Sequence, residues 1–183
     1  MVLTKQEGIG AWFWRDTNSS WLWLLVRLYL GYEWLMAGWA KVGAEAWTGS
    51  KAGTALAGFV TKALTKTSGA HPDVQSWYAW FLTHIVVPAP SFWSYLVAYG
   101  ELLVGIALIL GVVVGVAAFF GAFMNMNYML AGTVSVNPQM LALSVLLMLA
   151  WRVAGYIGLD YLALSRTGLL RKPDNILQPQ NVT

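Results

Sequence analysis

The feature that most constrains the fold is the stretch from Trp21 to Lys41, WLWLLVRLYLGYEWLMAGWAK. About 20 mostly apolar residues in a row match the length of a helix that crosses the hydrocarbon core of a bilayer. Arg27 and Glu33 nevertheless lie well inside the stretch. A charge at that depth is costly unless it faces protein or water. The stretch therefore predicts a membrane helix that turns Arg27 and Glu33 toward other parts of the chain.

The composition agrees with a protein embedded in a lipid bilayer. Of the 183 residues, 58% are hydrophobic and 10% are charged, whereas soluble domains carry about 25% charged residues. Eleven tryptophans suit aromatic belts at the membrane interface. The net charge of +3 is small and its lysines are scattered, which argues against nucleic acid as a partner. We expect one integral membrane domain with the lipid bilayer as its main surroundings.

Three further apolar stretches complete an expected all-α, four-helix membrane bundle. Asn137 followed by Pro138 is a favourable helix start, because asparagine caps and proline suits the first turn. The membrane domain covers residues 20–160, between an interfacial N-terminal lead over 1–19 and a polar C-terminal tail over 161–183. The expected spans cover about residues 20–41, 92–114, 116–136 and 138–159.

The long connection between the first two spans predicts two short amphipathic helices, at about residues 53–67 and 73–87. The apolar face of the second is rich in tryptophan and tyrosine and too short to cross a bilayer. We expect both helices to lie on the membrane surface as a cap over the bundle, and Pro88 and Pro90 to end the second. His84, within it, suits interfacial packing, with proton chemistry as the alternative.

Four spans place both termini on the same side of the membrane. Positive residues are slightly more frequent near the termini than in the long connection. The positive-inside rule then favours cytoplasmic termini for a multi-pass protein of the cell membrane. The basic residues that decide this are Lys5, Arg15, Arg166, Arg171 and Lys172 at the termini against Lys41, Lys51, Lys62 and Lys66 in the connection.

The antiparallel order of the spans sorts the buried polar residues by depth. With a rise of ~1.5 Å per residue, Arg27 and Arg152 each lie about 10 Å from the terminal side. Glu33 and Glu101 lie about 12 Å from the opposite side, and Asn125 lies near the middle. We therefore expect an arginine layer, an amide layer and a carboxylate layer within the bundle.

Small residues line the faces that carry these groups. Gly31, Trp34 and Gly38 share a stripe with Arg27 and Lys41 at helical spacing, and Glu101 shares one with Gly105 and Leu108. Glycines in such stripes let two helices approach closely in a membrane. A third stripe, in the third span, contains Gly121, Asn125, Tyr128 and Gly132. The stripes therefore predict close helix contacts at these faces.

Each polar residue has a functional and a structural interpretation. Glu33 and Glu101 are candidates for proton exchange, because two carboxylates at one depth can share a proton or bind a polar head group. Arg27, Arg152, Asn125 and Trp34 are candidate contacts for such a ligand. The structural alternatives are a brace for the arginines, snorkelling for Arg152 and Lys41, and interhelical hydrogen bonding for Asn125.

Two motifs carry a family resemblance. Arg27-x3-Gly31-x6-Gly38-x2-Lys41, followed by Gly100-Glu101-Leu102-x2-Gly105-x5-Gly111, resembles the DoxX/DoxD-like family of small four-helix membrane proteins. The resemblance covers about residues 20–160, and the long aromatic connection is more similar to the DoxD branch. It implies a subunit of a thiosulfate:quinone oxidoreductase, which oxidises thiosulfate to tetrathionate and passes electrons to quinone. Under this resemblance, the candidate ligand contacts become candidate quinone contacts: Arg27, Arg152, Asn125 and Trp34.

The chain has no cysteine, and both histidines lie outside the expected spans. Disulfides, iron–sulfur clusters and cysteine zinc sites are therefore excluded, and no metal or haem site is evident. If the chain takes part in redox chemistry, quinone or a second oxidoreductase subunit must therefore supply the electron relay, and a homo-oligomer is also compatible with the sequence. Two other functions remain open, a non-catalytic membrane anchor or assembly subunit of a redox complex and a small proton-linked transporter.

Overall fold

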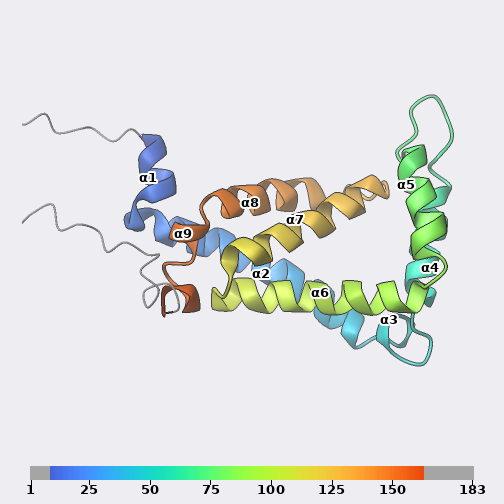
Figure 1. Cartoon of the computed structure of the whole chain (residues 1–183), viewed down its shortest axis with the longest axis horizontal. Coiled ribbons are helices and arrows are strands. Elements are labelled where there is room, and N and C mark those ends of the chain that lie inside the picture. Colours follow the sequence, from blue (N-terminus) through green and yellow to red (C-terminus); the bar gives the residue numbers. More distant parts are fainter. Residues whose placement is uncertain (1–8, 163–183) are drawn as a thin grey trace, which may run out of the picture.

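The computed structural model describes residues 9–162, and every regular element in that range is helical. The expected all-α class is confirmed there. Four long helices run side by side (Figure 1), and a short lead precedes them. The first eight residues of the predicted lead, and the predicted tail beyond Leu162, lie outside the described range. The lead contains α1 (Ile9–Arg15) and η1 (Thr17–Ser19), and the long helices are α2 (Ser20–Val42), α6 (Pro90–Leu110), α7 (Val114–Leu130) and α8 (Asn137–Leu149).

The four helices associate as two close pairs, α2 with α6 and α7 with α8. Glycines set the spacing of the first pair, as the stripes predicted. A Cβ atom at Gly38 would lie 2.6 Å from the Cα atom of Leu102, and one at Gly105 would lie 2.6 Å from the Cα atom of Leu35. Neither position has room for a side chain. The close contact predicted at these faces is thus confirmed, here between α2 and α6, and it depends on glycine.

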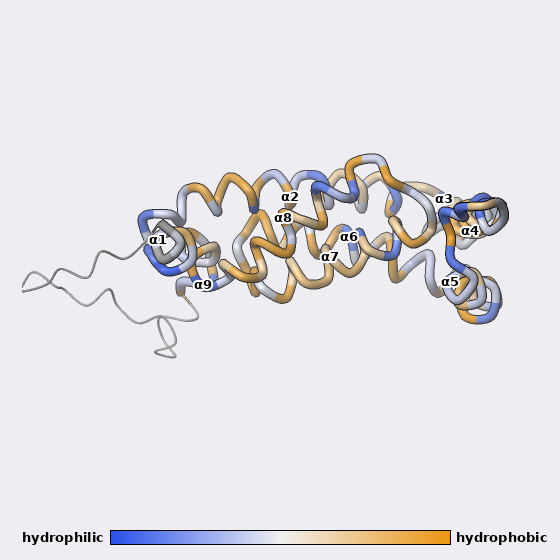
Figure 2. Tube along the Cα trace, turned by 90° about the horizontal axis from the view of Figure 1, so that it is seen from above, coloured by the Kyte–Doolittle hydropathy of each residue, from blue (hydrophilic) through white to orange (hydrophobic). Residues whose placement is uncertain are grey.

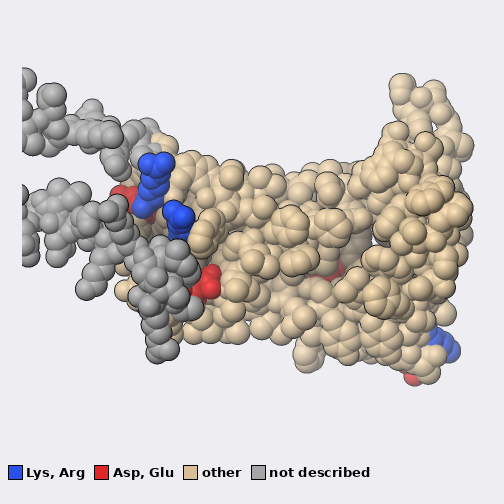
Figure 3. Space-filling view, in the orientation of Figure 1, with Lys and Arg blue, Asp and Glu red and all other residues tan. Residues whose placement is uncertain are grey.

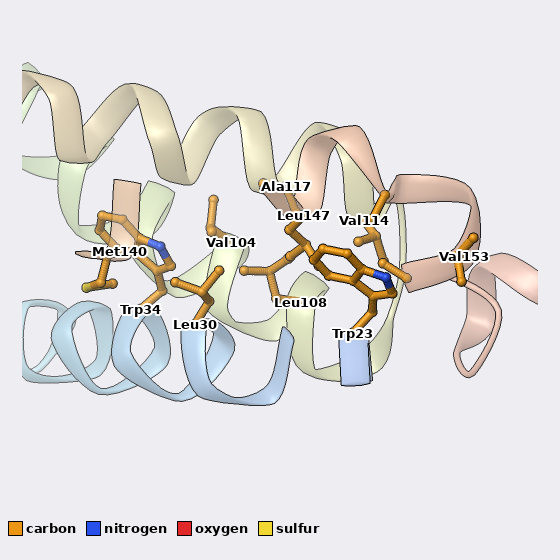
Figure 4. Packing of buried hydrophobic residues seen from close by; sticks show 13 residues of the cluster. Trp23, Leu30, Trp34, Val104, Leu108, Val114, Ala117, Met140, Leu147 and Val153 are labelled. Carbon is orange, nitrogen blue, oxygen red and sulfur yellow. The ribbon is translucent and has the colours of Figure 1, made fainter. Parts of the chain in front are cut away.

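The interior of the bundle is filled by side chains from all four helices. Leu30, Leu108 and Leu147 are completely buried where α2, α6 and α8 meet. Figure 4 shows Trp34 and Met140 at one end of this row and Trp23 at the other, with small alanines such as Ala117 between the larger groups. Such interlocking of large and small side chains fixes how the helices rotate against each other.

The outer surface of the bundle is also strongly apolar. Large side chains are exposed along every long helix, for example Leu25 on α2, Leu103 on α6, Phe120 on α7 and Leu149 on α8. Figure 2 shows hydrophobic residues along the bundle, and in Figure 3 the charges gather near the two ends of the face shown, apart from one small acidic patch. Among the described helices, α6 is the one that is both long enough and apolar enough to cross a membrane by itself. The helices α7 and α8 are apolar but shorter.

A second layer lies across one end of the bundle (Figure 1). This cap layer contains α3 (Glu45–Thr48), α4 (Thr54–Leu64), α5 (Ser76–Phe81) and the π-helix η2 (Leu82–Val86). Val60, Val74 and Tyr78 form a separate hydrophobic core that reaches Ala131 after α7. The Tyr78 hydroxyl donates to the main-chain oxygen of Asn127 over 3.0 Å, which fastens α5 to α7.

Two boundaries of the predicted connection are wrong. The second amphipathic helix begins at Ser76 instead of residue 73, and it changes to π-helical geometry after Phe81. Pro90 belongs to the first turn of α6, so that helix starts before the predicted residue 92. Proline is well tolerated in a first turn because the missing N–H has no helical acceptor there. The proline that was expected to end one helix therefore starts the next.

The predicted fourth span is not continuous. α8 ends at Leu149, and the short helix α9 (Trp151–Ala154) follows after a break at Ala150. The Arg27 guanidinium donates to the main-chain oxygens of Ala154 at 2.8 Å and Ile157 at 2.6 Å. The Ala154 carbonyl ends α9, where no internal donor is available, and Ile157 lies in the bend that follows. Arg27 thus binds the chain where the sequence predicted helix up to residue 159.

The same turn also closes the start of α7. The Asp160 carboxylate accepts hydrogen bonds from the main-chain nitrogens of Val113 at 2.6 Å and Val114 at 2.8 Å. A carboxylate at a helix N-terminus satisfies free N–H groups and suits the positive end of the helix dipole. Arg27 and Asp160 together fix the end of the bundle opposite the cap layer.

Candidate functional site

The most deeply buried carboxylate of the described chain is that of Glu101, on α6, which is 1% exposed. Its Oε2 atom lies 2.5 Å from the Lys41 Nζ atom at the end of α2. Its Oε1 atom accepts a hydrogen bond from the Tyr128 hydroxyl on α7. Both carboxylate oxygens therefore have a partner, each from a different helix. We call these three residues the Glu101 triad.

The glycine contact between α2 and α6 explains why Lys41 reaches Glu101. Gly38 brings α2 against Leu102, and Lys41 follows Gly38 by about one helical turn. The lysine side chain is 19% exposed, with Nζ 5.2 Å from the centre of the Trp47 ring on α3. The structural interpretation of Lys41 as a snorkelling anchor is therefore wrong. The motif that ends in Lys41 and the motif that contains Glu101 form one ion pair.

This arrangement can hold and release a proton inside an apolar protein. A buried carboxylate is tolerated when a cation and hydrogen-bond donors satisfy it. Ammonium, carboxylate and phenol are all groups that exchange protons, and here they contact one another directly. The triad is thus chemically suited to proton transfer, and it also braces three helices.

Besides the Arg27 Nε atom, four buried side-chain atoms on α2, α7 and α8 have no hydrogen-bond partner among the described residues. They are the amide nitrogen and oxygen of Asn125, the Trp34 Nε1 atom and the Ser144 hydroxyl. Asn125 is 0% exposed and precedes Tyr128 by one turn of α7. The indole of Trp34 points at the same helix, since a Cβ atom at Gly121 would lie 2.9 Å from Trp34 Nε1. We call Trp34, Asn125 and Ser144 the unpaired polar cluster.

An unpaired buried polar atom costs roughly 1–3 kcal/mol, so three such side chains in one region need an explanation. Water or a polar ligand that donates and accepts hydrogen bonds would satisfy them. Asn125 and Trp34 were predicted as ligand contacts, and the structure places both near Glu101. Sequence reasoning placed Tyr128 on the same helical stripe as Asn125 but assigned it no role, and it missed Ser144, because a serine in an apolar helix gives no distinctive pattern.

The predicted arginine layer does not form. Arg27 is buried at the far end of the bundle, where two main-chain carbonyls occupy its guanidinium. Arg152 is exposed, with its guanidinium 5.2 Å from the Trp151 ring centre. The break before α9 directs Val153 and Ala154 into the core and leaves Arg152 outside. Arg27 binds the main chain of α9, which carries Arg152, so both arginines lie at the terminal end of the bundle, as the depth estimate predicted. What is wrong is the expectation that both face the interior, because Arg152 points outward.

Glu33 is half-buried on α2 and forms no hydrogen bond or ion pair with any residue in the described range. It follows Tyr29 by one turn, and the Tyr29 hydroxyl accepts a hydrogen bond of 3.0 Å from Gln139 on α8. Glu33 therefore lies on the side of α2 that faces α8. The two carboxylates do not hydrogen-bond each other, so the predicted sharing of a proton between Glu33 and Glu101 is wrong in this structure.

Comparison with protein families gives one match. The sequence model of the DoxX family matches residues 22–138. The chain belongs to the DoxX family. The resemblance read from the two motifs is confirmed, and membership supports a membrane protein. The matched segment contains the Glu101 triad, Trp34 and Asn125, whereas Ser144 and Arg152 lie beyond it. A search of curated proteins and a search of solved structures each found no match.

Proposed function

We propose that this DoxX protein crosses the cell membrane four times and serves as the quinone-linked subunit of an oxidoreductase, with thiosulfate as the electron donor. The single observation that carries the proposal is the Glu101 triad, a proton-exchanging group buried beside unpaired polar atoms in an apolar bundle. The family resemblance supplies the reaction class.

The dimensions of the bundle support four membrane crossings. At ~1.5 Å per residue, the 23 residues of α2, the 21 of α6 and the 17 of α7 extend about 35, 31 and 25 Å. A bilayer core is about 30 Å thick. α8 is shorter, and α9 continues in the same direction after the break. The exposed apolar side chains along all four helices give the belt that lipid contact requires. The charge distribution of the sequence favours cytoplasmic termini.

The unpaired polar cluster suits the head group of a quinone. A quinone is a flat apolar ring with two carbonyl oxygens, and each oxygen accepts hydrogen bonds. Trp34 Nε1 and the Asn125 amide nitrogen are buried donors without an acceptor. Arg27 and Arg152 do not fit this role, because one caps a helix end and the other is exposed. We therefore assign quinone contact to Trp34 and Asn125, with Ser144 beside them.

The proton balance of the reaction gives the triad its role. Two thiosulfate ions lose one electron each and join through a new sulfur–sulfur bond to form tetrathionate. The quinone accepts both electrons together with two protons and becomes the quinol. The triad donates one of these protons to a quinone oxygen and regains it from water at the cap layer, while a second subunit carries the electrons. A general acid in such a position contributes about 10²–10⁴-fold to a rate.

The test is thiosulfate-dependent reduction of a soluble quinone by the purified protein in nanodiscs, alone and together with its co-purified partner subunit. We expect Glu101→Gln to lower the rate about 100-fold and Lys51→Gln, in the cap layer away from the triad, to leave it unchanged. Absence of both quinone reduction and quinone binding in both preparations would refute the proposal.

A non-catalytic anchor subunit is the second candidate, and the cap layer favours it. Trp77 and Trp80 are 59% and 58% exposed on α5, next to a well-packed core that holds them in place. Exposed tryptophans are frequent anchors of protein interfaces. If Trp77→Ala abolishes co-purification of the partner subunit while Glu101→Gln leaves the activity of the complex intact, the anchor function replaces the catalytic one.

A further inference from the structure

A groove opens in the cap layer between the second half of α4 and the turn that follows α7. It encloses about 370 Å³. Phe59 and Ala63 provide an apolar wall, and Gly132 and Thr133 form the opposite side. The volume is that of a small-molecule site.

Two lysines give the groove a positive charge. Lys62 lies in the last turn of α4, Lys66 lies in the turn that follows this helix, and both line the groove. Lys62 is exposed and forms no ion pair or hydrogen bond with any residue in the range 9–162. Lys66 is half-buried and donates one hydrogen bond to the main-chain oxygen of Gly132. Since an ammonium group has three N–H donors, Lys66 keeps two for a ligand. Asp73 lies next to Gly132 but forms no ion pair with either lysine.

The position of Lys66 depends on Gly132. This glycine has a φ of +70°, a conformation that side-chain-bearing residues rarely adopt. A Cβ atom there would lie 2.8 Å from the Lys66 Cδ atom. Glycine therefore allows the lysine to fold across the turn and to present its ammonium group to the groove.

The groove and the Glu101 triad share a wall. The Phe59 ring packs edge-on against the Tyr128 ring, with 6.0 Å between ring centres and an interplanar angle of 84°. The hydroxyl of the same tyrosine donates to Glu101. One pair of aromatic rings thus separates the positive groove from the buried carboxylate.

We propose that this groove is a binding site for a doubly charged tetrahedral oxyanion, held between Lys62 and Lys66. The two ammonium groups, one from the last turn of α4 and one from the turn after it, match two negative charges, and Thr133 adds a hydroxyl donor on the opposite side. The identification of this anion as thiosulfate rests on the proposed function, whereas the anion site itself does not. A lipid phosphate group offers similar oxygens, and the experiment separates the two sources.

The experiment measures heat of binding when sodium thiosulfate or sodium sulfate is added to the full chain in phosphatidylcholine nanodiscs. We expect saturable binding that Lys62→Gln and Lys66→Gln each weaken about tenfold or more, since a charge-assisted hydrogen bond contributes about 1.5–3 kcal/mol. Lys62→Arg is expected to retain binding because it keeps the charge. Lys51→Gln, an exposed cap-layer lysine outside the groove, is the matched control and is expected to change the affinity less than about twofold.

Three results would overturn the assignment. The first is no saturable binding of either anion. The second is an equal loss of affinity in Lys51→Gln, which would mean that the anion responds to the overall positive charge of the cap layer and not to the groove. The third is retention of phosphatidylglycerol that depends on Lys62 and Lys66 in mixed nanodiscs, without any binding of inorganic anions, which would assign the groove to a lipid head group.

Failure of this inference differs from failure of the proposed function, because binding is measured without quinone. Anion binding without quinone reduction would refute the function and support the groove. Undiminished thiosulfate-dependent reduction in a Lys62→Gln/Lys66→Gln variant would refute thiosulfate as the anion of the groove and support the function.

Discussion

Replacing Lys41 by methionine removes the cation beside Glu101 while it keeps a side chain of similar length. The Glu101 carboxylate, 1% exposed, would then retain only the Tyr128 hydroxyl as a partner. Breaking a buried ion pair by removing one member typically costs about 3–5 kcal/mol. Lys41 is 19% exposed, so water can enter part of the vacated space. We therefore expect a loss near the lower limit, about 3 kcal/mol in the free energy of unfolding.

A double-mutant cycle separates the ion pair from the loss of packing. Glu101→Gln removes the negative charge, so adding it to Lys41→Met is expected to restore about 2 kcal/mol. The assay is unfolding by sodium dodecyl sulfate in mixed micelles, followed by tryptophan fluorescence. Lys51→Met is the control, because Lys51 is exposed and a surface substitution changes stability by about 0.5 kcal/mol or less.

The reasoning would be refuted by either of two results. One is a cost for Lys41→Met no larger than that for Lys51→Met, which would mean that water already satisfies Glu101. The other is a double variant as unstable as the sum of its two single variants, which would mean that the two charges do not interact.

Two further predictions follow from the packing of the bundle and the cap layer. Gly38→Ala places a Cβ atom 2.6 Å from the Leu102 Cα atom, and such overpacking is expected to lower the free energy of unfolding by about 1–3 kcal/mol. Gly58→Ala is the control, because a Cβ atom there has nothing within 4 Å, and it is expected to stabilise the cap layer. Equal effects of the two substitutions in the same unfolding assay would contradict the close helix contact. Burial raises the pKa of Tyr78, in the cap layer, to about 12 from 10. The folded state favours the neutral phenol. The contribution of Tyr78 to the free energy of unfolding is therefore complete below pH 10, and about 2–3 kcal/mol of it is lost as the pH rises toward 12. Tyr78→Phe removes this dependence, and parallel stability curves of the two proteins between pH 9 and 12 would disprove it.

The positions of the helices follow directly from the sequence. Apolar runs of membrane length define α2 and α6, and the Asn137–Pro138 pair lies at the start of α8, as predicted. Asn137 is, however, the first helical residue and does not cap the helix. These signals are local, because helix length and first-turn residues depend on neighbours in the chain. The glycines at 38 and 105 marked faces of close helix contact, since small residues at helical spacing allow such an approach, and the structure shows that these two faces meet.

Depth within the bundle could be predicted, but rotation about each helix axis could not. The rise per residue correctly placed Glu101 and Asn125 in the interior. It could not show that Arg152 turns outward, because the helices carry apolar residues on nearly all sides and their hydrophobic pattern does not select one inner face. The break at Ala150, which exposes Arg152, lies beside the turn whose carbonyls Arg27 binds from far away in the chain.

The sequence by itself therefore determined that this chain forms apolar helices with charged residues in their interior, and that stripes of small residues mark faces of close contact. Only the tertiary structure decided which groups meet. It paired Lys41 with Glu101, brought Tyr128 to the same carboxylate, and left Trp34, Asn125 and Ser144 unpaired beside them. The physical reason is that a buried charge requires a partner but does not specify one, and the partner is selected by the packing of side chains from three different helices.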